Sequence, residues 1–140
     1  MNPDAIETTM EIVADAIGDP ADLIYDKVFH KAPDLRGLFV LDTDGAVRGE
    51  MLFRVFELII DLAQGRGYAE QLLRTEYVNH QGLGVPQAQF ILLFDAIIET
   101  FREALDDQWT PDIDLAWTQL HERIAAITTD SMRAFPDSAK

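Results

Sequence analysis

Apolar residues recur every three or four positions along nearly the whole chain, which is the period of an α-helix. Proline and glycine interrupt this pattern at regular intervals, for example at Gly18-Asp19-Pro20 and at Gly65-Arg66-Gly67. We therefore predict helices over residues 3–17, 21–31, 46–64, 68–80, 86–105 and 112–132, with a short helix that begins at Pro33. We find no convincing strand in this pattern. It predicts an all-α fold of about seven helices that form one domain over residues 1–140.

The same spacing predicts which side chains point inward. In the short helix after Pro33, we expect Leu35, Leu38 and Phe39 to face the core. In the helix over 46–64, the apolar stripe consists of Val47, Met51, Leu52, Val55, Phe56 and Ile59. The loop between these helices, Asp42-Thr43-Asp44-Gly45, resembles the start of a calcium-binding loop. It lacks the glutamate that would complete the ligand set, so we do not expect calcium there.

The charge and composition exclude several classes of function. The 140 residues carry a formal net charge of −14, which disfavours binding to nucleic acid or to anionic membranes. No apolar run is long enough to cross a bilayer, and the acidic N-terminal residues do not resemble a secretory signal. The chain has no cysteine, which rules out disulfides and thiol catalysis within it. Because a reducing compartment suits such a chain, we expect a cytoplasmic protein.

Three histidines, His30, His80 and His121, are the remaining candidates for metal chemistry. Their spacing does not form a zinc site, because no pair stands at ligand spacing with a third donor. No glycine-rich phosphate loop precedes a helix, and no arrangement typical of a nucleophilic hydrolase is present. The residues by themselves therefore indicate an all-α domain without indicating its function.

Several short motifs resemble the globin family when they are taken in order. They are Ile24-Tyr25-Asp26-Lys27-Val28-Phe29, Ala32-Pro33-Asp34-Leu35, Leu38-Phe39, Asn79-His80 before Gly82, Phe90, and Trp109-Thr110-Pro111. Their order and spacing over residues 20–130 are similar to those of single-domain bacterial globins and of the globin domain of flavohaemoglobins. The resemblance implies a globin-like fold of about seven helices around a haem pocket.

The resemblance also assigns roles to particular residues. It implies that His80 is the axial ligand of haem iron, with its second ring nitrogen bonded to the backbone carbonyl of Glu76. It implies that Tyr25 donates a hydrogen bond to a bound gas and that Phe39 packs on the haem face. The expected apolar haem contacts are Leu52, Leu73, Val85, Phe90 and Phe94.

The polar distal position on the helix over 46–64 has two possible registers. Alignment of Met51-Leu52-Phe53 with the family places Arg48 at this position and Leu52 one turn inward. Counting from Phe39 without a gap gives Gly49 and Phe53 instead. We prefer the first register, in which Arg48 reaches a haem propionate or a bound anion.

The chain departs from flavohaemoglobins on the proximal side. Phe90 stands where they carry a tyrosine, and Met132 stands where ungapped counting from Trp117 would place their glutamate. These differences argue against a strongly activated, peroxidase-like iron. Because the chain ends after the last predicted helix, we also expect no flavin- or NAD-binding reductase domain.

We therefore predict a globin with haem b that reversibly binds a diatomic gas, chiefly dioxygen, for storage, delivery, nitric-oxide scavenging or sensing. Scavenging by dioxygenation would require an external reductase, and the prediction favours a binding protein over an enzyme. The alternative is a haem-free regulatory or interaction module with a globin fold. Glu76 motivates it, because the family usually places an apolar haem contact there. Pairing of the two long C-terminal helices in a homodimer is left open.

Overall fold

A computed structural model describes residues 2–134 of the chain. Over this range it contains six α-helices and two short 3₁₀ helices and no strand. The elements are α1 (Pro3–Ile17), α2 (Ala21–Lys31), η1 (Pro33–Phe39), α3 (Ala46–Ala63), α4 (Gly67–Gly82), α5 (Gln87–Leu105), η2 (Asp106–Gln108) and α6 (Pro111–Ala134). The predicted α-helices are confirmed, with each boundary within two residues of its expected place. The predicted all-α class is likewise confirmed.

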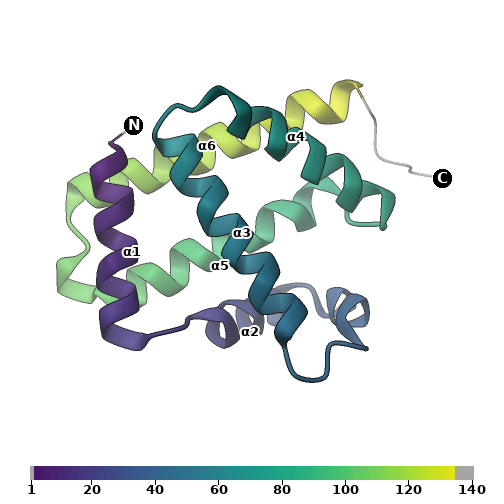
Figure 1. Ribbon diagram of the computed structural model, residues 1–140, viewed down its shortest axis with the longest axis horizontal. Coiled ribbons are helices and arrows are strands. Elements are labelled where there is room, and N and C mark those ends of the chain that lie inside the picture. Colours follow the sequence, from purple (N-terminus) through teal and green to yellow (C-terminus); the bar gives the residue numbers. More distant parts are fainter. Residues whose placement is uncertain (1, 135–140) are drawn as a thin grey trace.

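The helices cross one another at steep angles instead of forming a parallel bundle (Figure 1). Helix α3 passes in front of α5, α1 packs against both α5 and α6, and α2 packs across α5. Helix α4 lies against α6. This arrangement leaves α2, η1 and the start of α3 on one side of α5, with α4 on the other (Figure 1). The side chains predicted to form a site are therefore distributed over both of these groups.

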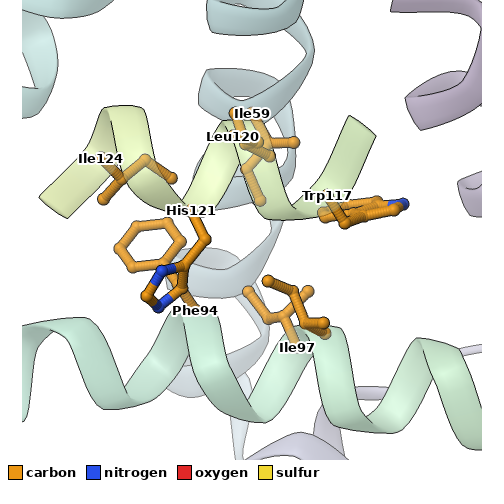
Figure 2. Close-up of a pocket in the computed structure, with 8 residues that line it drawn as sticks. Ile59, Phe94, Ile97, Trp117, Leu120, His121 and Ile124 are labelled. Carbon is orange, nitrogen blue, oxygen red and sulfur yellow. The ribbon is translucent and has the colours of Figure 1, made fainter. Parts of the chain in front are cut away.

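The core is tightly packed where α3, α5 and α6 meet. Figure 2 shows Ile59 of α3, Phe94 and Ile97 of α5, and side chains of α6 converging there. The space between them is too small for a water molecule. His121 lies at the edge of this contact, and its Nε2 is 2.6 Å from Oδ1 of Asp95 on α5. These three helices therefore form a rigid support for the rest of the fold.

A buried hydrogen bond joins the first helix to the last. The indole Nε1 of Trp117 donates to Oγ1 of Thr9 over 3.1 Å, and both side chains are almost completely buried. The Thr9 hydroxyl in turn donates to the carbonyl of Ala5 over 2.7 Å. Because both buried polar groups have partners, they impose little desolvation penalty, and they fix the position of α1 against α6.

Two expected core positions are wrong. Leu38 is 48% exposed, because the neighbouring Phe39 ring takes the inward place at the end of η1 and two consecutive side chains cannot both point there. Val47 is 59% exposed, because the first turn of α3 extends past the core and its first buried side chain is Leu52. Among the described residues, no helix has the length and apolarity needed to cross a membrane.

Candidate functional site

His80 lies in the last turn of α4, with one ring nitrogen held by the backbone. Its Nδ1 is 2.7 Å from the carbonyl oxygen of Glu76, which is the contact predicted from the sequence. A carbonyl oxygen can only accept a hydrogen bond, so Nδ1 must carry the hydrogen. In the neutral imidazole this leaves the lone pair on Nε2. The ring of Phe90 packs edge-on against His80 at a centroid distance of 5.3 Å and fixes the imidazole plane further.

The buried face of α4 is formed by residues beside Glu76 and not by Glu76 itself. Leu73 and Tyr77 are completely buried, whereas Glu76 is half-buried and keeps part of its surface in solvent. The Tyr77 ring lies 5.4 Å from Phe90 by centroid distance, edge-on. Glu76 therefore does not carry the full desolvation cost of an enclosed carboxylate. That cost is the reason why a glutamate at an expected haem contact argues against a haem site.

Tyr25 on α2 has a buried hydroxyl group without a hydrogen-bond partner. The residue is 3% exposed, and its ring packs against Phe29 and Phe39 at centroid distances of 5.9 and 5.7 Å. Burial raises the pKa of Tyr25 far above its usual value; the Arg48 guanidinium opposes this shift without cancelling it, and the Asp42 carboxylate adds to it. The phenol is therefore a protonated donor that lacks an acceptor, and such a group costs about 1–3 kcal/mol when buried.

Asp42 organises the start of α3, a role that sequence reasoning missed. Its carboxylate accepts hydrogen bonds from the backbone N–H groups of Val47 and Arg48 and from Nε of Arg48. Each of these bonds has a donor–acceptor distance of 3.0 Å. The residue at the helix start, Gly45, has no side chain to cap these donors and adopts a positive φ of 77°. Burial alone would raise the pKa of Asp42, but the hydrogen bonds and the guanidinium together lower it. An aspartate three residues before a glycine that begins a helix without a side-chain cap is the signal that would have identified this role.

Arg48 is engaged by the loop that precedes its helix. Besides the pair with Asp42, its Nη2 lies 3.4 Å from the Asp42 carbonyl, and a side chain at Gly45 would contact the guanidinium at 3.2 Å. The predicted distal arginine therefore folds back toward residues 42–45. Burial along α3 distinguishes the two possible registers of the distal position. Leu52 is 2% exposed and Phe53 is 62% exposed. This burial favours the register with Arg48 and Leu52 over the one with Gly49 and Phe53.

A pocket of about 350 Å³ opens beside Phe39. Its lining consists of Phe29, Arg36, Gly37, Phe39, Val40, Asp42 and Arg48. On the α4 side, the remaining predicted contacts form a second apolar group. Leu73, Val85 and Phe94 are buried, and Phe90, which is half-buried, lies 5.9 Å from the Phe94 ring. The structure thus collects the predicted residues into one group around Tyr25 and another around His80.

No group of three or more His, Asp or Glu side chains within residues 2–134 is arranged to hold a metal ion. His30 is exposed and His121 is paired with Asp95. Of the three histidines, His80 alone combines a fixed Nδ1 with a surrounding of aromatic rings. This arrangement fits a single axial ligand to a metal that a larger cofactor holds in place.

Comparison with known proteins shows which family the sequence matches. The family model described as Globin matches residues 22–128. Leghemoglobin 49 of Vicia faba is 27% identical over 119 residues, which are 79% of this chain and 82% of that protein. A leghemoglobin of Canavalia lineata is 25% identical over 118 residues, or 79% of each chain. Anaerobic nitrite reductase NSHB5 of Oryza sativa subsp. indica is 28% identical over 64 residues, 46% of this chain and 44% of that protein.

These relatives are plant proteins, so the narrower resemblance to bacterial globins and flavohaemoglobins stays a prediction. The family itself is confirmed by a match that covers most of the described helices, from the start of α2 to near the end of α6. The chain belongs to the globin family.

Proposed function

We propose that this globin holds haem b with His80 as the axial ligand and reversibly binds a diatomic gas, chiefly dioxygen. The observation that carries the proposal is the Tyr25 hydroxyl, which is buried and has no hydrogen-bond partner. A protein that encloses such a donor lowers its free energy when an acceptor comes within hydrogen-bonding distance of it. The leghemoglobin names of two relatives agree with an oxygen-binding role for this chain.

The donor set around His80 fits haem. A neutral imidazole with its Nδ1 tied to a carbonyl is the axial donor that globin haem requires. The residues that would enclose the macrocycle are apolar and lie on η1, α3, α4, α5 and the loop between α4 and α5: Phe39, Leu52, Leu73, Val85, Phe90 and Phe94. Haem, when bound, would supply an iron that can bind a diatomic gas, and His80 would hold that iron.

Tyr25 would then determine how long the gas stays in the pocket. Because its pKa is raised, the phenol remains a donor at any physiological pH. Its hydrogen bond to dioxygen would contribute about 0.5–1.5 kcal/mol, the usual net value for a neutral pair. The described residues offer no histidine for the distal side, since His30 is exposed and His121 is paired with Asp95. This supports gas binding over peroxidase-type catalysis, which relies on a distal base.

The physiological role of such a globin depends on its affinity for the gas and on whether a redox partner is present. Storage and delivery need only the gas site, whereas nitric-oxide dioxygenation would also need an external reductase to return the iron to the ferrous state. The absence of cysteine supports a reducing compartment such as the cytoplasm.

The test is the absorbance spectrum of the protein after haem is added, for the wild type, His80→Ala and His30→Ala. We expect a Soret band and an increase in Tm for the wild type, because a ligand of the folded state stabilises it. His80→Ala should alter the band and lose the increase, and the exposed His30 is the matched control that should change neither.

A band that is identical in wild type and His80→Ala would refute the axial assignment. If haem neither gives a band nor raises the Tm of the wild type, the haem-free globin module is the correct function instead.

A further inference from the structure

Arg36 differs from every other described cation in having no carboxylate partner. The chain has eleven lysines and arginines, and the side chains of nine of them are described. Eight of these nine form salt bridges, at Lys27, Lys31, Arg48, Arg54, Arg66, Arg74, Arg102 and Arg123. In a chain with 25 acidic residues, carboxylates are available almost everywhere. A cation left unpaired in such a chain is a candidate for binding an anion from outside it.

The Arg36 guanidinium is held in place by an aromatic ring. Its central carbon lies 4.7 Å from the centroid of Phe29, a ring that is only 3% exposed. This cation–π contact orients the flat guanidinium without using its N–H groups. The donors at its edge therefore remain available to a planar acceptor such as a carboxylate, which arginine binds through two parallel hydrogen bonds.

The surroundings of Arg36 determine which kind of anion fits. Arg36 lines the pocket of about 350 Å³, together with the apolar surfaces of Phe29, Phe39 and Val40. The other two charged residues of this pocket, Asp42 and Arg48, are paired with each other. The pocket thus combines one uncompensated positive charge with aromatic walls. This combination suits a carboxylate attached to a flat apolar body better than a small hydrated ion such as chloride.

We propose that Arg36 binds a carboxylate of this kind in the pocket beside Phe39. One source of the carboxylate is a haem propionate, and this version rests on the proposed function. The other source is a free aromatic or aliphatic acid, and this version requires only the pocket itself. In both versions the residue that binds the carboxylate is Arg36 and not Arg48, because the Arg48 guanidinium already donates hydrogen bonds to Asp42.

The first experimental arm uses the haem-free protein and benzoate as the probe. Binding is followed by NMR chemical shifts for the wild type, Arg36→Gln, Arg36→Lys and Arg54→Gln. The last is the matched control, because Arg54 is an exposed arginine whose removal changes the net charge equally. If the acid is free, we expect Arg36→Gln to weaken benzoate binding by roughly tenfold or more. Arg36→Lys should give an intermediate loss and Arg54→Gln no loss. Since Arg36 is exposed, an unchanged Tm of each variant checks that it folds.

The second arm compares haem with haem dimethyl ester, whose propionates carry no charge. If Arg36 binds a propionate, Arg36→Gln should raise the Kd of haem roughly tenfold and leave the Kd of the dimethyl ester unchanged. The wild type and Arg54→Gln should both bind haem more tightly than haem dimethyl ester.

The two arms separate the possible outcomes. A loss confined to charged haem identifies the propionate, and a loss confined to benzoate identifies a free acid. Failure of the wild type to bind any haem would refute the proposed function. The benzoate measurement, which uses the haem-free protein, would then still decide whether Arg36 binds a carboxylate. The proposal is overturned if Arg36→Gln affects neither ligand, or if Arg54→Gln reduces binding as much as Arg36→Gln does.

Discussion

The buried hydroxyl of Tyr25 makes the substitution Tyr25→Phe act in opposite directions on stability and on gas binding. In the haem-free protein the hydroxyl has no partner, and the substitution removes only that group from a ring that otherwise keeps its packing against Phe29 and Phe39. An unsatisfied buried hydroxyl costs about 1–3 kcal/mol, so the free energy of unfolding should rise by that amount. This increase is a large fraction of the ~5–15 kcal/mol that stabilises a domain.

Urea unfolding of the haem-free protein, followed by circular dichroism, measures the first effect. With an m value of about 2 kcal/mol/M, the midpoint should rise by about 0.5–1.5 M. The control is Tyr68→Phe, because Tyr68 is 57% exposed and its hydroxyl is near Arg66 at the surface. This control should leave the midpoint unchanged.

Stopped-flow displacement of dioxygen by carbon monoxide, in the haem-loaded protein, measures the second effect. Loss of a hydrogen bond worth about 0.5–1.5 kcal/mol should accelerate dioxygen dissociation roughly 2- to 10-fold. Two results would contradict this reasoning. A lower urea midpoint for Tyr25→Phe would mean that the hydroxyl has a partner in the folded protein, and an unchanged dissociation rate would mean that it does not face the gas.

Two further predictions concern the support of the site. Asp42→Asn should lower the Tm at pH 7, because the carboxylate caps α3 and pairs with Arg48. Since the pKa of Asp42 is lowered in the folded state, its contribution is complete above the usual value of 3.8 and is lost as the pH falls below it. The Tm difference between wild type and variant, measured by calorimetry, should therefore shrink below pH 4, and a constant difference would rule out the ionised carboxylate as its origin. Thr9→Val should lower the free energy of unfolding by about 1–3 kcal/mol, because it leaves the buried Trp117 N–H without an acceptor. Urea unfolding measures this, the exposed Thr8→Val serves as control, and an equal effect of both variants would exclude the hydrogen bond as the cause.

The helices were predictable because their signals are local. The proline and glycine that end each segment act on neighbouring residues, and the period of three to four positions reports which side of a helix is apolar. The two errors have different causes. At Leu38 the next residue, Phe39, takes the inward place, whereas Val47 lies on the apolar stripe in a turn of α3 that extends past the core. Periodicity shows that a side chain lies on an apolar stripe, but it does not show where along the helix the neighbouring helices begin and end.

The candidate site was predictable in part, and for a different reason. Tyr25, Phe39 and His80 were identified by their resemblance to a family, since nothing in their local pattern marks them as functional. Arg48 was identified in the same way, and its engagement by Asp42 depends on how residues 42–45 fold back over the start of α3. Arg36 was not singled out at all. Its distinguishing property is the lack of a partner, which becomes visible only when every other cation has been placed.

The sequence by itself determined the helices, their order and the family to which the chain belongs, because these depend on spacing along the chain. The tertiary structure alone decided that the Tyr25 hydroxyl is enclosed without an acceptor, that Asp42 occupies Arg48, and that Arg36 remains unpaired over Phe29. Each of these facts concerns whether a polar group has a partner. That is set by the three-dimensional positions of all the polar groups around it, and short-range pattern carries no information about them.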